Sequence, residues 1–287
     1  MILTADDFGI SPAVDEAILL LIEKDRISST SCMVTGDNPD LRQDLSSLKK
    51  LSHKIDVGLH LVLTEAKALA THDYAEGLTD ADGNFFTLKA LAARAYSGRL
   101  NKVSIEKEIR AQIESFVRLF GRVPDFIDGH QHVQQLPTIK DAVISTMKIF
   151  DSIIYVRVAN LPTQWIWNSA QSFSLRFALE NLALTIPGRQ ASAAFSENNV
   201  RHNRYLLGYY RHTPNIQFNS VFKKYLTLRP QSDDIFFCHP GYIDEHLKRV
   251  DTLVESRKDN LNFLMSAEFE DLHKTNQISI NRFPSVI

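Results

Sequence analysis

Short apolar runs with strand-like spacing alternate with longer segments of helical periodicity along most of this 287-residue chain. In one helical segment Ser11 is the expected N-cap and Pro12 the first helical residue, and another ends at Gly121. Parallel strands need crossover connections, usually helices, so the alternation predicts an α/β fold with a mostly parallel sheet. Periodicity alone leaves open whether this sheet is open or closes into an irregular (β/α) barrel. The predicted strands are residues 2–5, 29–34, 55–63, 126–130, 153–158 and 235–238.

The overall composition excludes several classes of protein. The formal net charge of -2 and the pI near 6.6 offer no broad attraction to nucleic acid. The sequence contains neither a membrane-spanning apolar run nor a signal-peptide pattern at its N-terminus. Cys32 and Cys238 lack the spacing of zinc or redox motifs and are expected to be buried apolar residues. We therefore predict a cytoplasmic protein without a nucleic-acid partner, whose oligomeric state, a homodimer included, the sequence leaves open.

Aromatic side chains gather in the segment from about residue 160 to 218. One interpretation is a helical elaboration whose aromatic residues pack on the sheet, since such residues usually serve cores. The other is a substrate-facing lid that presents aromatic platforms. In both cases we predict a single domain over residues 1–287 that carries this elaboration. The aromatic residues concerned are Trp165, Trp167, Phe173, Phe177, Phe195, Tyr205, Tyr209 and Tyr210.

Acidic and histidine side chains follow the ends of four predicted strands. In parallel α/β folds, the loops that leave the carboxyl ends of the strands carry the catalytic groups. Adjacent side chains on an extended strand point to opposite sides, so one of Asp6 and Asp7 would hold a metal while the other faces solvent or substrate. The same alternation places Asp128, His130 and His132 on one face. The remaining candidates are His60 and His239.

One aspartate and two histidines form the donor set of an open divalent-metal site. Such a site keeps a coordination position for water or substrate, and its ion lowers the pKa of bound water and polarises a carbonyl. A second carboxylate would take the proton of that water, and His239 would return a proton to a leaving nitrogen. Each segment alone also has a structural interpretation. Asp6 and Asp7 would then cap the following helix, and each histidine would be a hydrogen-bonded structural residue.

These segments resemble, in order, the motifs of the YdjC-like family of carbohydrate deacetylases, which includes chitooligosaccharide and hopanoid-associated deacetylases. The resemblance covers residues 4–11, 57–64, 126–133 and 238–244. It implies an irregular (β/α) barrel and hydrolysis of an N-acetyl group on an amino sugar. It also implies a divalent ion bound by Asp7, His60 and His130.

The same resemblance implies roles for five further residues. Asp6 would be the catalytic base and His239 the acid. Asp128 and His132 would support the metal ligands from behind, and Arg157 would contact sugar or acetate.

Two positions depart from the family pattern. Gln134 stands where many members carry a histidine, and Gly129 replaces a small hydroxyl residue. An amide cannot carry a proton as an imidazole does, which removes that function from position 134. The segment at residues 78–85 and the aromatic-rich segment resemble the hopanoid-associated branch, which implies an N-acetylglucosaminyl lipid as substrate.

The leading hypothesis is metal-dependent removal of the N-acetyl group from an N-acetylglucosamine-containing oligosaccharide or glycolipid, with release of acetate. One divalent ion, magnesium or zinc, is the expected cofactor, and an acetylated amino sugar is the expected partner. A first alternative is a carbohydrate- or lipid-binding protein with a structural ion, although binding alone needs neither Asp6 nor His239. A second is a non-haem iron oxygenase, since one carboxylate and two histidines also suit that metal.

Overall fold

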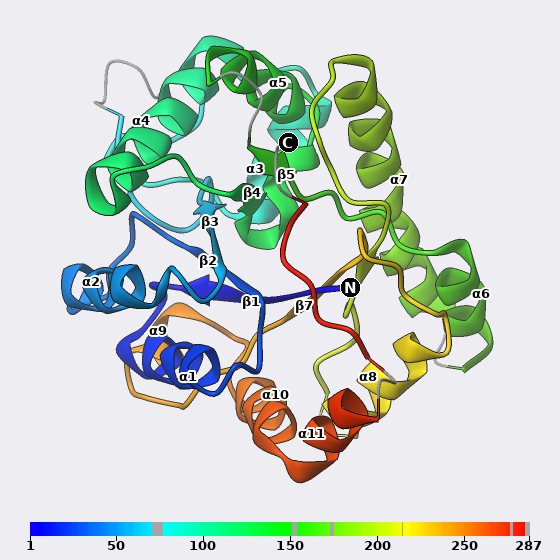
Figure 1. The fold of residues 1–287 in the computed structure, drawn as a ribbon. Coiled ribbons are helices and arrows are strands. Elements are labelled where there is room, and N and C mark those ends of the chain that lie inside the picture. Colours follow the sequence, from blue (N-terminus) through cyan, green and yellow to red (C-terminus); the bar gives the residue numbers. More distant parts are fainter. Residues whose placement is uncertain (71–76, 151–153, 173–174, 214, 276–277, 285–287) are drawn as a thin grey trace.

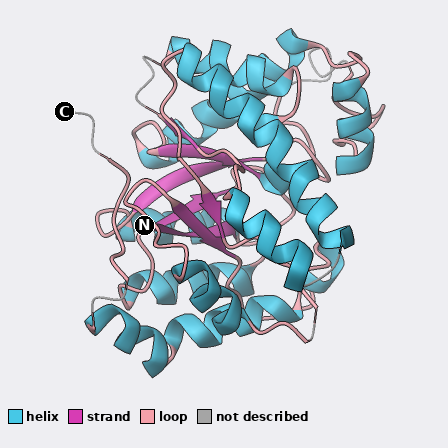
Figure 2. Ribbon diagram, turned by 90° about the vertical axis from the view of Figure 1, so that its right-hand side faces the viewer, coloured by secondary structure: helices cyan, strands magenta, loops and turns pink. Residues whose placement is uncertain are grey.

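A sheet of parallel strands lies at the centre of the molecule, with helices around it (Figures 1 and 2). The computed structural model describes residues 1–70, 77–150, 154–172, 175–213, 215–275 and 278–284. In this part of the chain the sheet has seven strands in the order β5-β4-β3-β2-β1-β7-β6. The strands are β1 (Ile2–Phe8), β2 (Ser29–Cys32), β3 (Asp56–Leu61), β4 (Phe126–Gly129), β5 (Tyr155–Val156), β6 (Leu206–Leu207) and β7 (Ile235–Cys238).

The two edges of the sheet meet, so that the sheet curls into an irregular barrel. Beside the edge strand β5, the amide of Val156 donates to the carbonyl oxygen of Arg201 at 2.8 Å. The Asn203 side chain closes the same seam, because it accepts from the amide of Val158 at 2.7 Å and donates to the carbonyl of that residue at 2.9 Å. These contacts take the place of a regular seventh pairing. The predicted α/β fold with a mostly parallel, irregular barrel is confirmed.

Helices connect consecutive strands, as parallel pairing requires. Ser11 caps α1, where its hydroxyl accepts from the amide of Val14, and Pro12 occupies the first turn. Gly121 ends α4 in the left-handed conformation, with φ of 75°. The start of α1 and the end of α4 agree with the prediction from the sequence. The helices are α1 (Pro12–Glu23), α2 (Leu41–Leu51), α3 (Leu88–Tyr96), α4 (Lys102–Phe120), α5 (Ile139–Ile149), α6 (Thr163–Ser172), α7 (Leu175–Glu197), α8 (Phe218–Leu226), α9 (Leu247–Val250), α10 (Glu255–Met265) and α11 (Ala267–Lys274).

The hydrophobic core lies between the sheet and the inner faces of these helices. On α4 the residues Ile105, Ile109, Ile113 and Phe116 recur at helical spacing and are fully buried. Burial of each such side chain contributes about 1.5–3 kcal/mol. Helices cover the outer side of the sheet. Cys32 and Cys238 are buried together with the aliphatic residues. The core therefore holds the carboxyl ends of the strands in fixed positions.

The chain after β4 differs from the prediction. Residues His130–Gln135 form a 3-10 helix, η2, instead of continuing the strand. Within η2, Gln131 and His132 adopt the left-handed conformation with φ of 55° and 58°. The prediction that Asp128, His130 and His132 share one face of an extended strand is therefore wrong. The strand cannot continue because the left-handed backbone of Gln131 and His132 is incompatible with an extended chain.

The aromatic-rich segment contains two helices and a strand of the sheet. α6 and α7 pack against each other, and β6 follows them. Trp165 is buried and stacks on Tyr225 of α8 with ring centroids 3.8 Å apart. Phe177, Phe195 and Tyr210 are also buried, Trp167 is exposed, and Phe173 lies outside the described residues. The buried members thus serve the core, while the organisation of the chain as one domain stays a prediction. None of the helices in the described ranges has the length and apolar character needed to cross a bilayer.

Candidate metal centre

Asp6 and Asp7 lie at the carboxyl end of β1, where the strand is irregular. The pairing of β1 with β2 shifts its register between Ala5 and Phe8, and Asp7 has a left-handed φ of 67°. Aspartate tolerates this conformation better than most residues. The irregularity changes the direction of the side chains, and both carboxylates are buried, with exposed fractions of 2% and 3%. Neither carboxylate is therefore exposed to solvent, and the expectation that one of them faces a substrate stays a prediction.

Asp7, His60 and His130 converge as predicted. Oδ1 of Asp7 lies 3.0 Å from Nε2 of His60 and 3.2 Å from Nδ1 of His130. One potential ligand atom from each of the three residues lies within 4.8 Å of the others, which is close enough to share an ion. The residues come from β1, β3 and the start of η2. Only the barrel brings these three segments together.

His60 is held by a carboxylate on each side. Its Nδ1 lies 2.7 Å from Oδ1 of Asp128 and 3.0 Å from the hydroxyl of Ser31, while its Nε2 faces Asp7. If Nδ1 carries a proton that it donates to Asp128, Nε2 has a lone pair that points at an oxygen of Asp7. Two lone pairs repel each other, so this contact is favourable only with a proton or a metal ion between the two atoms. Burial lowers the pKa of His60, but Asp128 and Asp7 outweigh it and raise the pKa to about 10. The position therefore favours positive charge, which a divalent ion also supplies.

The second oxygen of Asp7 faces a cation. Its Oδ2 accepts a hydrogen bond from Nη2 of Arg257 at 2.6 Å and lies 3.8 Å from Nε2 of His239. Burial alone would raise the pKa of Asp7, but Arg257 and the two histidines at Oδ1 hold it well below its usual value. The same Nη2 contacts Asp251 at 2.5 Å. Oδ1 is thus left as the oxygen of Asp7 that is available to a metal.

Asp6 is paired with Arg157, which is fully buried at the end of β5. The two Nη atoms of Arg157 donate to the two oxygens of Asp6 at 2.6 Å each, and Nη1 also lies 3.1 Å from Oδ2 of Asp128. Burial and the nearby Asp128 raise the pKa of Asp6 to about 6, although Arg157 opposes this shift. The guanidinium therefore supplies the cation between these two carboxylates. In this structure Arg157 binds protein carboxylates and is not exposed to a substrate.

His239 and His132 differ in their relation to the site. His239 follows β7, and burial holds its pKa well below the usual value, so that the imidazole is neutral at rest. His132 packs edge-on against Phe237, and its Nδ1 is buried without a hydrogen-bond partner among the described residues. Burial and Arg157 lower the pKa of His132 to about 3. His239 thus lies beside Asp7, whereas within the described residues His132 forms no hydrogen bond with a candidate ligand.

The two departures from the family pattern, Gly129 and Gln134, contact each other. A Cβ atom added at Gly129 would lie 2.4 Å from Oε1 of Gln134, which is closer than a real contact allows. Gln134 is fully buried, and its Nε2 donates to the carbonyl of Arg157 at 2.7 Å. The glutamine amide therefore occupies the space that a side chain at position 129 would need, and it supports the backbone of Arg157.

Arg257, Asp251 and Ser31 complete the surroundings of the candidate ligands, and sequence reasoning missed all three. Arg257 lies on α10, and Asp251 precedes that helix. An arginine on an amphipathic helix is normally a surface residue, so the sequence carries no local signal for either. Ser31 alternates along β2 with Cys32, and that alternation would have placed it on the inner side of a closed barrel.

The charges of the buried cluster do not balance within the protein. Two guanidinium groups, Arg157 and Arg257, face the four carboxylates of Asp6, Asp7, Asp128 and Asp251. With neutral histidines, as metal binding at the ring nitrogens requires, these groups carry an excess of two negative charges; without an ion, protonation of His60, which its raised pKa favours, removes one of them. Asp251 is partly exposed, but the other three carboxylates are buried, and uncompensated buried charge is costly. A divalent cation between Asp7, His60 and His130 neutralises that excess, so the residues present fit such an ion.

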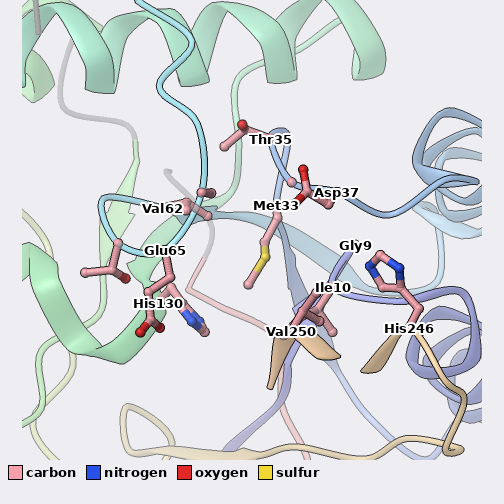
Figure 3. Close-up of a pocket in the computed structure, with 13 residues that line it drawn as sticks. Gly9, Ile10, Met33, Thr35, Asp37, Val62, Glu65, His130, His246 and Val250 are labelled. Atoms are coloured by element: carbon pink, nitrogen blue, oxygen red, sulfur yellow. The ribbon is translucent and has the colours of Figure 1, made fainter. Parts of the chain in front are cut away.

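A pocket opens beside this cluster (Figure 3). It encloses about 500 Å³, including the part that is open to solvent. His130 and Glu65 line one side, and Gly9 and His246 line the other. Since His130 is both a candidate ligand and part of the wall, a molecule in the pocket lies next to the metal position. The other lining residues are Ile10, Met33, Thr35, Gly36, Asp37, Val62, Thr64, Ala66 and Val250.

Curated relatives of the chain are named as deacetylases. A carbohydrate deacetylase of Danio rerio is 27% identical over 208 residues, which make up 72% of this chain and 64% of that protein. A chitooligosaccharide deacetylase of Yersinia enterocolitica is 36% identical over 139 residues, which make up 48% of this chain and 52% of that protein. The chain thus spans between about half and two thirds of the length of these relatives.

The fold and the family are shown by two further comparisons. A crystal structure from Enterococcus faecalis V583, provisionally named a cellobiose-phosphate cleavage protein, superposes with a TM-score of 0.72. The superposition covers 98% of this chain and 96% of that chain at 22% identity, and it shows that the two share a fold. The profile of YdjC-like proteins matches residues 1–275, nearly the whole chain. The chain therefore belongs to the YdjC-like protein family.

Proposed function

We propose that the protein hydrolyses the N-acetyl group of an amino sugar with the help of one divalent metal ion. The convergence of one aspartate oxygen and two imidazoles within 4.8 Å, in a cluster that holds more carboxylates than guanidinium groups, carries this proposal. Asp7, His60 and His130 would hold the ion. The names of the relatives, carbohydrate deacetylase and chitooligosaccharide deacetylase, support the reaction class.

The bound ion would polarise the acetyl carbonyl and acidify a water molecule. Asp6 would accept the proton of that water, because a carboxylate keeps lone pairs free even when both oxygens accept from Arg157. Asp6 must be ionised for this step. Arg157 favours the ionised form and fixes the plane of the carboxylate, so it acts as a positioning residue for the base.

His239 is the proposed donor to the departing amine. Its imidazole is neutral at rest because burial disfavours the charged form. A neutral imidazole is a weak acid, so His239 would deliver the proton that Asp6 has taken from water. Asp128 would hold the Nδ1 proton of His60 and thereby keep the Nε2 lone pair directed at the metal position.

The substrate we propose is N-acetylglucosamine in an oligosaccharide or a glycolipid; the polar groups that several loops bring to the pocket support a polar ligand. Two imidazoles and one carboxylate favour zinc over magnesium, because magnesium prefers oxygen ligands. We also propose a cytoplasmic location, which rests on the sequence alone.

The decisive experiment measures acetate release from N-acetylglucosamine oligomers and N-acetylglucosaminyl lipids, with and without a chelator. We expect release to stop with the chelator and to return with added zinc or magnesium. Asp6→Asn should keep the metal and lose about 10²- to 10⁴-fold in turnover, the range of a general base. Asp7→Ala should lose the metal as well. Near wild-type deacetylation by Asp6→Asn would disprove the base assignment.

The burial and pairing of Asp6 also suit a binding protein with a structural ion, because a buried ion pair between Asp6 and Arg157 can stabilise the fold without any catalytic role. That alternative predicts saturable binding of the same oligomers without acetate release. Acetate release that depends on Asp6 excludes it.

A further inference from the structure

Four large apolar side chains form an exposed stripe along α7. Leu175, Leu179, Leu182 and Ile186 are exposed to 73%, 57%, 38% and 53%. Their spacing of four, three and four residues places them on one face of the helix. We refer to these four residues as the α7 stripe. Scattered apolar surface residues are common, but a contiguous row of this kind marks an interaction surface.

The opposite face of α7 packs against the rest of the protein. Phe177, Asn181 and Ala191 are buried there, and the carbonyl of Leu184 accepts from the side chain of Gln135 at 3.1 Å. At Gly188 the helix contacts the backbone of the segment that follows β5. A Cβ atom added at Gly188 would lie 2.3 Å from the carbonyl oxygen of Ala159. The stripe is therefore not a core face that has turned outward. A helix that is apolar on both faces is normally covered on both.

A tryptophan and positive charge accompany the stripe. Trp167, on the neighbouring helix α6, is 67% exposed, and α6 packs along α7 (Figure 1). Residues 160–218 contain five arginines and two glutamates, although the chain as a whole carries a net charge of -2. Glu180, which lies between Leu179 and Leu182 on α7, is paired with Arg176 and Arg211. Glu180 with its two arginines keeps one positive charge, Arg189 adds a second while donating to Asn160 and Thr163, and Arg204 is paired with Asp234. The surface around the stripe is thus apolar with a small excess of positive charge.

A second copy of the chain is a poor match for this surface. Specific dimers bury about 800 Å² on each partner with about 20–30 residues a side. The four side chains of the stripe together expose about as much as two whole leucines. The stripe also spans fewer than two heptads, whereas a helix pair held by such a pattern needs about three to four. An anionic lipid surface needs no such area, because leucine, tryptophan and arginine side chains each contribute individually.

From the stripe, Trp167 and the flanking arginines, we infer that this face docks on a bilayer that contains anionic phospholipid. The aliphatic side chains and the indole enter the boundary between head groups and acyl chains, and Arg176 and Arg189 at the two ends of the stripe meet lipid phosphates. This inference concerns a surface outside the candidate metal centre and does not depend on the proposed hydrolysis.

Sedimentation with vesicles tests the inference on the full-length protein. We expect binding to vesicles of phosphatidylcholine mixed with phosphatidylglycerol, weaker binding to phosphatidylcholine alone, and a loss of binding as salt is raised. Leu179→Ser with Leu182→Ser should reduce binding at least about tenfold, because each removes an inserted aliphatic side chain. Leu175→Ser with Ile186→Ser is an independent second pair with the same expected loss.

The matched control is Val103→Ser with Leu88→Ser. These residues lie on α4 and α3 and are exposed to 55% and 37%, nearly the same as Leu179 and Leu182. The control should bind vesicles like the wild type, and all variants should unfold at the wild-type temperature because the side chains are exposed.

Equal loss of binding by the control pair would overturn the inference, and so would full binding by both stripe pairs. Light scattering measures whether the protein is a monomer or a dimer in solution. A dimer in solution that both stripe pairs convert to monomer would show that a second copy, and not lipid, covers the stripe. Acetate release from soluble N-acetylglucosamine oligomers should be unchanged in the stripe variants, which separates a failure of docking from a failure of the proposed function.

Discussion

The contact between Gly129 and Gln134 makes a quantitative prediction about the support of the candidate metal centre. Gly129 has an extended backbone with φ of -151°, which any residue adopts, so only space limits this position. A methyl group there would lie 2.4 Å from Oε1 of Gln134 and 3.2 Å from its Cδ and backbone nitrogen. Gly129→Ala therefore forces the buried glutamine side chain to move.

The cost of this movement has two parts. The glutamine loses its hydrogen bond to the carbonyl of Arg157, which is worth about 1 kcal/mol, and the overpacking adds about 1–3 kcal/mol. We therefore expect Gly129→Ala to lower the free energy of unfolding by about 2–4 kcal/mol. Gln134→Ala removes the obstructing atoms, and in that background the methyl group at position 129 meets mainly the backbone nitrogen at 3.2 Å.

A double-mutant cycle measured by urea unfolding checks this reasoning. The double variant Gly129→Ala with Gln134→Ala should be more stable than the sum of the single effects by about 1–3 kcal/mol, the range of coupled neighbours. A pair that carries serine at 129 and histidine at 134, as the resemblance suggests, should show the same sign. Additivity within about 0.5 kcal/mol, or a neutral Gly129→Ala, would refute the proposed contact.

Three other tests concern the site and its surroundings, and a fourth concerns the packing of α7. Arg157→Met removes the buried cation between Asp6 and Asp128 and leaves Asp6 without its partner, while Asp128 keeps His60; it should lower the free energy of unfolding by about 3–5 kcal/mol, measured in urea, and a loss below about 1 kcal/mol would show that the pairing is not structural. Zinc added at about 100 times its Kd should stabilise the wild type by about 2.7 kcal/mol in calorimetry and release protons into unbuffered solution, and no stabilisation would mean that the cluster does not bind the ion. Because burial raises the pKa of Asp6 to about 6 and a base works only when ionised, acetate release should be present above this pH and should fall as the pH drops through it; an acid limb that is unchanged in Asp6→Asn would assign it to another group. Gly188→Ala brings a methyl group 2.3 Å from the backbone oxygen of Ala159 and should cost about 1–3 kcal/mol in thermal or urea unfolding, whereas wild-type stability would show that α7 shifts freely.

The local features of the fold were predictable from the sequence because they depend on residues close together in the chain. The cap at Ser11, the end of α4 at Gly121 and the apolar runs of the strands each follow from a few neighbouring residues. The closure of the barrel was not predictable in this way. It depends on contacts such as that of Asn203 with Val158, which join residues 45 positions apart.

The conformation of the site residues was also beyond sequence reasoning. An extended strand was the natural expectation for the segment from Asp128 to His132, and the left-handed backbone of His132 has no signature in the sequence. Asp7 likewise takes a left-handed conformation that turns its side chain into the cluster. Such conformations persist only because the surrounding structure holds them in place.

The sequence by itself determined the alternation of strands and helices and the identity of the acidic and histidine candidates, since periodicity and motif are properties of the linear chain. Only the tertiary structure decided which charges share the cluster. Arg257 reaches Asp7 across 250 positions, and Arg157 reaches Asp6 across 151. Electrostatic energy depends on distance in space and on burial, and neither quantity exists until the barrel has closed.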